Sequence, residues 1–103
     1  MSRTLVMGIL NITPDSFADG GKYLSKEDAI TQGRRLIAEG ADIIDIGGES
    51  TKPGVDRVSE ADELERVIPA VTELVKDGAV ISVDTMRSEV AKQAIAAGAS
   101  YIN

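Results

Sequence analysis

The sequence predicts an α/β fold in which parallel strands alternate with helices. Three segments, at residues 38–45, 76–84 and 96–103, share one pattern: a helix-like stretch, a glycine, and a short apolar run ending in a polar residue. A glycine just past a helix end adopts left-handed backbone at little steric cost. Nearly continuous apolar runs are typical of strands buried on both faces. With the first apolar run of the chain, these segments predict four strands joined by three helices, with parallel pairing and right-handed crossovers.

The expected strands are Leu5–Leu10, Ile43–Ile46, Val80–Val83 and Ser100–Ile102. The expected helices are Lys26–Glu39, a stretch from Ser59 to about Lys76, and Arg87–Ala97. Ser25 and Ser59 precede the first two helices, each with an Asp three residues later, which is close to a capping box. Pro69 lies inside the second helix and predicts a kink or a split there. Composition leaves two architectures open, a doubly wound open sheet and a (β/α)8 barrel.

Charge and composition exclude several classes of function. The chain carries 17 acidic and 11 basic residues, a formal net charge of −6, which argues against a general nucleic-acid or membrane surface. It has no Cys and no His, so these 103 residues supply no disulfide, thiolate zinc site or histidine base. The apolar run near the start is too short for a signal-peptide core or a membrane span. We therefore expect a cytoplasmic protein.

Two long connections leave the carboxyl ends of expected strands, where α/β proteins place their sites. The first, Asn11–Ser25, concentrates donors and acceptors around Phe17, the single Phe of the chain. The second, Gly47–Val58, offers a Gly-Gly pair for close backbone approach to a ligand, and then Thr51 and Lys52 for an anion such as phosphate. Taken alone, each connection also fits a solvated turn-rich loop.

Asp45, Asp84 and Asn103 lie at or just past the ends of three expected strands. A single Asp there is most simply a helix cap or a turn residue. Three such side chains at one edge favour a site, since carboxylate and amide groups pair with heterocycles that present ring N–H donors beside acceptors. A pterin fits this description, although other heterocycles do too. The charged residues of the helices, Glu63 among them, are interpreted as solvated surface.

Several motifs of this chain resemble those of the dihydropteroate synthases. Met7 to Phe17, followed by Asp19-Gly20-Gly21, resembles the first signature of that family, and Asp45 to Gly54 resembles the second. Ser82 to Thr85 and Tyr101 to Asn103 are similar to its next two strand ends. The resemblance extends over essentially the whole chain, in order. It implies the N-terminal part of a (β/α)8 TIM barrel: a partial pterin-binding domain over residues 1–103 whose C-terminal remainder is absent.

The resemblance also implies an activity, the condensation of 4-aminobenzoate with a dihydropterin-methyl diphosphate to give dihydropteroate and diphosphate. Asp84 and Asn103 would hold the pterin ring, and Asn11 would help to coordinate Mg²⁺ bound to the leaving diphosphate. The family is the target of sulfonamides. The full-length protein is expected to be a homodimer that binds the pterin diphosphate and 4-aminobenzoate and binds neither nucleic acid nor membranes.

The remaining implied roles fall on the two long connections. Asp15 would stabilise a cationic intermediate, Thr51 would contact the diphosphate or pterin, and Phe17 and Pro53 would border the aminobenzoate pocket. Lys52 would join Asp15 and Thr51 in catalysis; it replaces the usual Arg, keeping the charge but losing bidentate phosphate contact.

Two other readings remain open. One is a non-catalytic pterin-binding module. The other is a methyltetrahydrofolate-binding barrel of corrinoid methyl transfer, which shares strand-end Asp and Asn residues but lacks the Thr-Pro-Asp-Ser-Phe loop. Because later strands of the synthase barrel supply further site residues, we expect the 103-residue chain by itself to be inactive.

Overall fold

The computed structural model describes residues 4–12, 25–48 and 58–103. The elements are β1 (Met7–Asn11), α1 (Lys26–Ala38), β2 (Ile43–Gly47), α2 (Glu60–Lys76), β3 (Ile81–Asp84), α3 (Ser88–Ala97) and β4 (Tyr101–Ile102). The predicted alternation of strands and helices is confirmed. Element bounds differ from the expected ones by one or two residues, so that β1 begins at Met7 and not at Leu5.

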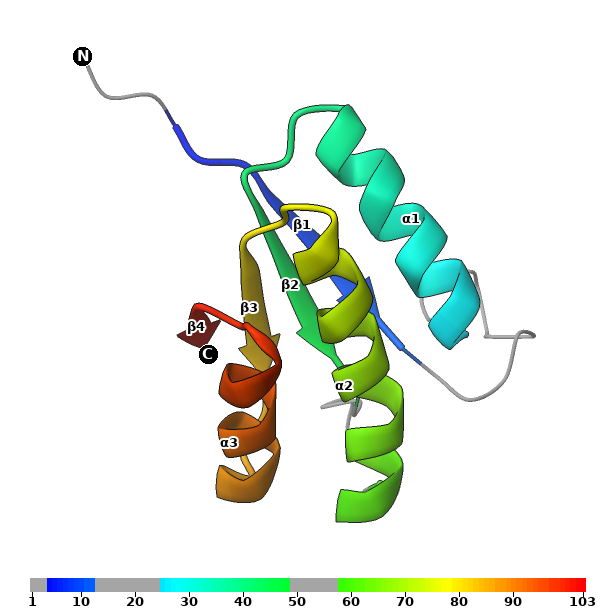
Figure 1. Cartoon of the computed structure of the whole chain (residues 1–103), viewed down its shortest axis with the longest axis vertical. Helices are drawn as coiled ribbons and strands as arrows, with labels where there is room; N and C mark the ends of the chain where they lie inside the picture. Colours follow the sequence, from blue (N-terminus) through cyan, green and yellow to red (C-terminus); the bar gives the residue numbers. More distant parts are fainter. Residues whose placement is uncertain (1–3, 13–24, 49–57) are drawn as a thin grey trace, which may run out of the picture.

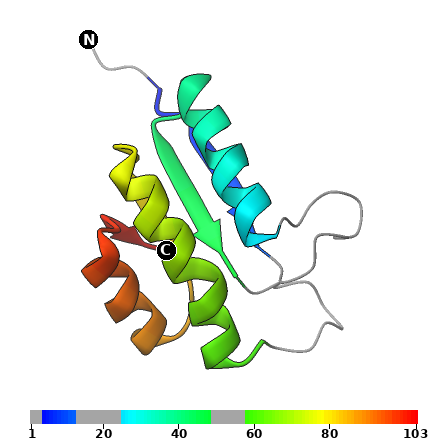
Figure 2. The same cartoon turned by 45° about the vertical axis from the view of Figure 1, so that its right-hand side comes forward.

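All four strands are parallel and lie in the sheet in the order β1-β2-β3-β4 (Figure 1). Both views show the three helices on one side of the sheet (Figures 1 and 2). A doubly wound sheet reverses its strand order at a switch point and carries helices on both faces. Sequential order with helices on one face is instead the arrangement of a barrel wall, which resolves the choice left open by composition.

The core lies between the sheet and the helix layer. Alternate strand residues point into it, and those of the three longer strands are buried: Gly8, Leu10, Ile44, Ile46, Ile81 and Val83. They meet the apolar stripe of α2, which consists of Val67, Ala70, Val71 and Leu74 and has no exposed surface. This packing fixes which face of every strand is turned away from the helices.

The helix ends form as their sequence signals predict. Ser25 Oγ accepts the Asp28 N–H at 3.2 Å, and Ser59 Oγ accepts the Asp62 N–H at 3.1 Å. Three glycines just past the helices take positive φ values of 107°, 87° and 116°: Gly40, Gly78 and Gly98. Helices therefore stop where the next strand must begin, and the strand ends are placed at a common edge.

Helix α2 continues through Pro69 without interruption from Glu60 to Lys76, so of the two expected outcomes, a kink or a split, the split does not occur. Proline in a helix interior removes one hydrogen bond and costs about 3 kcal/mol. Val67, Ala70 and Val71, which flank Pro69, are fully buried against the sheet. Their burial, each worth roughly 1.5–3 kcal/mol for the larger side chains, outweighs that cost and keeps the helix in one piece.

The opposite face of the sheet carries no helix among the described residues (Figure 2). Met7, Ile9 and Tyr101 project from it and are 46%, 62% and 56% exposed. Barrel strands turn this face inward, where layers of side chains fill the interior. None of the helices within residues 4–12, 25–48 and 58–103 has the length and apolar character that a bilayer crossing requires.

Candidate functional site at the carboxyl ends of the strands

Asn11, Gly47, Asp84 and Asn103 form a row across the sheet at the carboxyl ends of its strands. The register pairs Asn11 with Gly47, and Gly47 with Asp84. The Asn103 N–H donates to the Val83 carbonyl at 2.8 Å, which carries the β3–β4 pairing one residue further and sets Asn103 beside Asp84. Because side chains alternate along strands, the side chains of Asn11, Asp84 and Asn103 leave the sheet on the face without helices. The structure thus places Asp84 and Asn103 at one rim.

Asp45 lies one layer deeper on the same face. It is paired with Ile9 on one side and with Ser82 on the other, and it is only 7% exposed. The strand continues to Gly47, so Asp45 is not a strand-end residue as expected. Its Oδ1 is buried and has no hydrogen-bond partner among the described residues. A buried carboxylate oxygen without a donor is unusual and marks a position that can accept a hydrogen bond.

The acidic surroundings of Asp84 change its proton affinity. Partial burial raises the pKa of the Asp84 carboxyl above its ordinary value of 3.8, and the negative charges of Asp45 and then Glu63 raise it further. The Asp84 side chain nevertheless reaches solvent. Like charges disfavour ionisation of Asp84, whereas a ligand that donates N–H groups to it favours ionisation. The rim is therefore suited to a donor-rich ligand.

Glu63 of α2 is buried, at 2% exposure, directly beside this rim. Its Oε2 accepts the Thr85 hydroxyl at 2.6 Å, and its Oε1 accepts Arg87 Nη1 at 2.7 Å. The interpretation of Glu63 as solvated surface is wrong. The helical spacing of residues 63, 67, 70 and 74 puts Glu63 on the buried stripe of α2, and this spacing is the signal that could have identified it.

Gly48 follows β2 and lies against α2. A Cβ at this position would stand 2.9 Å from Val67 Cγ2, closer than real contacts allow. Arg66 Nη1 donates to the Gly48 carbonyl at 2.9 Å. Contact with α2 therefore leaves no room for a side chain at this position, a steric reason for the glycine that the sequence did not reveal. A Cβ at Gly47 would stand 3.6 Å from Asn11 Oδ1, an ordinary contact distance on the open face.

Five predicted site residues lie outside the described residues: Asp15, Phe17, Thr51, Lys52 and Pro53. Their roles stay predictions, as do the ligand-binding roles of Asn11, Asp84 and Asn103.

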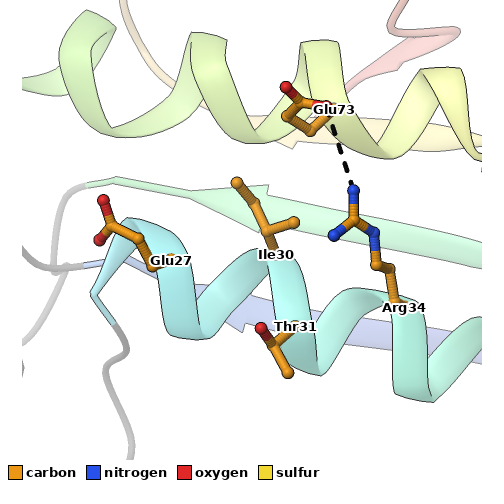
Figure 3. A pocket seen from close by; sticks show the side chains of 5 residues that line it. All are labelled: Glu27, Ile30, Thr31, Arg34 and Glu73. Atoms are coloured by element: carbon orange, nitrogen blue, oxygen red, sulfur yellow. Dashed lines mark ion pairs between the residues drawn. The ribbon is translucent and has the colours of Figure 1, made fainter.

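A separate hollow of about 370 Å³ lies between α1 and α2 (Figure 3). It is lined by Glu27, Ile30, Thr31, Arg34 and Glu73. Arg34 spans it, pairing with Glu73 at 4.0 Å and with Asp77. These ion pairs join the two helices on the outside of the helix layer, and none of the lining residues belongs to the strand-end row.

Comparison with known proteins places these features in one family. The model of a family described as pterin-binding enzymes matches residues 7–103. The dihydropteroate synthase of Bacillus subtilis is 57% identical over 102 residues, which are 98% of this chain and 36% of that protein. A structure of the Xanthomonas albilineans dihydropteroate synthase with 4-aminobenzoic acid is 53% identical with a TM-score of 0.87, over 98% of this chain and 38% of that one.

A structure of the Yersinia pestis dihydropteroate synthase in complex with a sulfonamide drug is 48% identical, with a TM-score of 0.84 over 98% of this chain and 36% of that one. The chain thus spans somewhat more than a third of the length of these relatives. The sheet order, the free inner face and the strand-end row all agree with the first part of a barrel of this kind.

Proposed function

Because this chain belongs to the family of pterin-binding enzymes, we propose that it forms the N-terminal part of the barrel of a dihydropteroate synthase. In that role it would join 4-aminobenzoate to a dihydropterin-methyl diphosphate in folate synthesis, releasing diphosphate. The observation that carries the proposal is the placement of Asp84 and Asn103 side by side on the free face of the sheet. The B. subtilis and X. albilineans relatives, both named dihydropteroate synthases, support it.

The rim has the chemistry to hold a pterin. A carboxylate such as Asp84 accepts two adjacent N–H donors, and the amide of Asn103 offers both a donor and an acceptor. A pterin presents an amino group next to a ring N–H, with ring acceptors beside them. The two side chains leave neighbouring strands, which lie about 4.8 Å apart in a sheet, so a single planar ring can meet both.

The anion of the substrate is assigned to the connection after β2. Thr51 supplies a hydroxyl, and Lys52 supplies a positive charge for the departing diphosphate. Lys52 holds this anion as a point charge, because it lacks the planar fork of arginine. Asp15, on the first long connection, supplies a carboxylate for positive charge on the pterin methylene, and Phe17 and Pro53 border the aminobenzoate.

Asn11 fits a magnesium ion that arrives with the substrate. Asn11 is the last residue of β1, and its side chain lies on the free face. Its amide oxygen is a suitable ligand, because Mg²⁺ prefers oxygen ligands. Within the part of the chain that the structure describes, no three acidic, His or Cys side chains gather as a metal cage. One protein oxygen plus diphosphate oxygens and waters suits Mg²⁺, which is commonly held by substrate phosphates. When bound, the ion would neutralise charge on the diphosphate.

The residues of this chain can contribute positioning and charge stabilisation to the condensation. The bond between the pterin methylene carbon and the diphosphate oxygen breaks, and its electron pair leaves with the diphosphate. The lone pair of the arylamine nitrogen then forms the new C–N bond, and that nitrogen releases a proton. Positioning and charge stabilisation carry such a reaction. It requires no His or Cys nucleophile, and the chain has neither.

The proposal also covers the location and the oligomeric state of the protein. We expect it to work in the cytoplasm on these small molecules, as a homodimer when the barrel is complete. The binding of sulfonamide in place of 4-aminobenzoate follows from the same pocket.

A chimera tests the function. This chain would replace the matching residues of the B. subtilis synthase, and calorimetry would measure binding of the pterin diphosphate with and without Mg²⁺. Turnover, together with binding that needs Mg²⁺, is the expected result. Binding that is independent of Mg²⁺ and without turnover would assign a plain pterin-binding module. Absence of pterin binding by a folded chimera would refute the proposal.

A further inference from the structure

We propose that Glu63 is a positioning residue for the pterin-binding end of β3, and that it acts by holding the backbone next to Asp84 against the start of α2. The inference rests on the proposed function, since it takes Asp84 as a pterin ligand. No sequence motif points to it; the observation is a buried carboxylate with two short hydrogen bonds beside the rim.

The contacts of Glu63 converge on the residues that follow Asp84. Thr85 is the next residue, and its hydroxyl donates to Glu63 Oε2 at 2.6 Å. The same hydroxyl accepts the Arg87 N–H at 3.2 Å, which shapes the turn after β3. Arg87 Nη1 donates to Glu63 Oε1 at 2.7 Å. Both carboxylate oxygens of Glu63 thus fix the segment from Thr85 to Arg87, which follows β3.

Arg87 extends the link to the start of α2. Its Nη2 donates to the carbonyl of Val58, the residue before the Ser59 cap. Its planar fork can reach two acceptors at once, which a lysine cannot do. On the other side of Glu63, Arg66 holds the Gly48 carbonyl at the end of β2. The ends of β2 and β3 and the start of α2 are therefore tied together through the first two turns of α2.

Burial distinguishes this cluster from the other ion pairs among the described residues. The Glu63 and Arg87 side chains are 2% and 19% exposed, whereas Arg34, Arg35 and their partners are between 35% and 69% exposed. Exposed pairs contribute little, but a buried carboxylate requires its partners. Such a group resists displacement of the atoms bonded to it. A site needs that resistance, because errors of about 1 Å in position weaken binding and catalysis strongly.

The test uses the chimera with the B. subtilis synthase and compares KM for the pterin diphosphate with KM for 4-aminobenzoate. We expect Glu63→Gln to raise the pterin KM about tenfold, equivalent to about 1.4 kcal/mol, and to leave the aminobenzoate KM within about twofold. Glu73→Gln is the matched control. It makes the same change ten residues further along α2, about 15 Å away, and should alter neither KM.

A pair of smaller changes keeps the test decisive if Glu63→Gln fails to fold. Thr85→Val removes the hydroxyl at constant shape and should raise the pterin KM, whereas Thr85→Ser should restore it. A purely structural role would lower the unfolding temperature of Thr85→Val and leave the ratio of the two KM values unchanged. That outcome, or an unchanged ratio in folded Glu63→Gln, overturns the inference. If the unmodified chimera binds no pterin, the proposed function itself is refuted. If it binds pterin and the variants leave the ratio of the two KM values unchanged, only the inference about Glu63 is refuted.

Discussion

Asp45 and Asp84 leave the same face of the sheet from neighbouring strands, with Asp84 one layer nearer the rim. The register sets Asp45 opposite Ser82, two residues before Asp84. Two carboxyl groups at this spacing repel each other when both are ionised, and a third carboxylate, Glu63, lies on the adjoining helix. Negative charge is thus concentrated around the rim assigned to the pterin, which favours ligands that donate protons or hydrogen bonds.

The first prediction concerns the pH dependence caused by Asp84. Its pKa is raised, so the folded protein retains this proton at pH values where the unfolded chain has released it. The stability that Asp84 contributes is therefore fully present below its ordinary pKa of 3.8 and is lost as the pH rises through its folded pKa. Asp84→Asn should be more stable than the unmodified chimera at neutral pH, and this advantage should disappear in acid. Urea unfolding across the pH range measures it.

Asp45→Asn tests whether the charge of Asp45 helps to raise the pKa of Asp84. Removing this charge should move the pKa of Asp84 back toward its ordinary value, as followed by NMR titration of the Asp84 carboxyl carbon. The partial burial of Asp84 and the negative charge of Glu63 remain, so the pKa should return only part of the way. Glu73→Gln, at the far end of α2, should leave the titration unchanged. A titration of Asp84 that is insensitive to Asp45→Asn would show that the two carboxyl groups do not interact.

The second prediction concerns Gly33, where α1 packs on α2. A Cβ here would stand 2.8 Å from Leu74 Cδ1 and 3.1 Å from Leu10 Cδ1, and both leucines are fully buried. Alanine in a helix interior is favoured over glycine by about 1 kcal/mol. Overpacking costs about 1–3 kcal/mol, and neither leucine can swing into solvent. Gly33→Ala should therefore destabilise the chimera by about 1 kcal/mol in urea unfolding.

A double variant identifies the reason. Leu74→Ala alone should cost about 2–5 kcal/mol because it leaves a cavity in the core. In that background, Gly33→Ala no longer meets the leucine methyl groups, and it should become neutral or stabilising. If Gly33→Ala is equally harmful in both backgrounds, close packing against Leu74 is not the reason for the glycine.

The order of elements could be predicted from the sequence because its signals are local. Gly40, Gly78 and Gly98 mark helix ends, and Ser25 and Ser59 mark helix starts, each acting within a few residues of the chain. Strand order is different, since it depends on which strands pair, and the paired residues lie 36 apart in sequence for β1–β2, 37 for β2–β3 and 19 for β3–β4. Composition did not distinguish the barrel wall from a doubly wound sheet; the family resemblance predicted the barrel, and the strand order confirmed it.

The candidate site was predictable where a polar residue ends an apolar strand, as at Asp84. It was missed at Glu63, whose spacing with Val67, Ala70 and Leu74 places it on the buried stripe of α2. Its partner Arg87 lies on another element. Asp45 was placed at a strand end, but β2 continues past it to Gly47. Helical spacing can indicate that a charged group is buried, but its partners depend on contacts between distant segments, which no local pattern reports.

The third prediction concerns the cap of α2. Ser59 Oγ accepts the Asp62 N–H at 3.1 Å, and it adjoins the Val58 carbonyl that Arg87 holds. Ser59→Ala should cost about 1 kcal/mol of stability, within a general range of about 0.5–2 kcal/mol. Ser59→Asp should retain the stability, since aspartate caps equally well and favours the helix N-terminus. Urea unfolding of the two variants measures this, and equal loss in both would exclude a capping role.

The last prediction concerns the 103-residue polypeptide studied by itself. Among the described residues, its sheet has two unpaired edges, along β1 and β4, and a free face from which Met7, Ile9 and Tyr101 project. Exposed edges and apolar faces pair with other chains, so we expect self-association in size-exclusion chromatography at micromolar concentration. We expect no coupled turnover of pterin diphosphate and aminobenzoate, because one sheet of four strands cannot enclose both substrates. Ile9→Lys should reduce association by placing a charge on the free face, and Lys92→Ala on α3 is the surface control. A stable, active monomer would contradict the assignment of this face to a barrel interior.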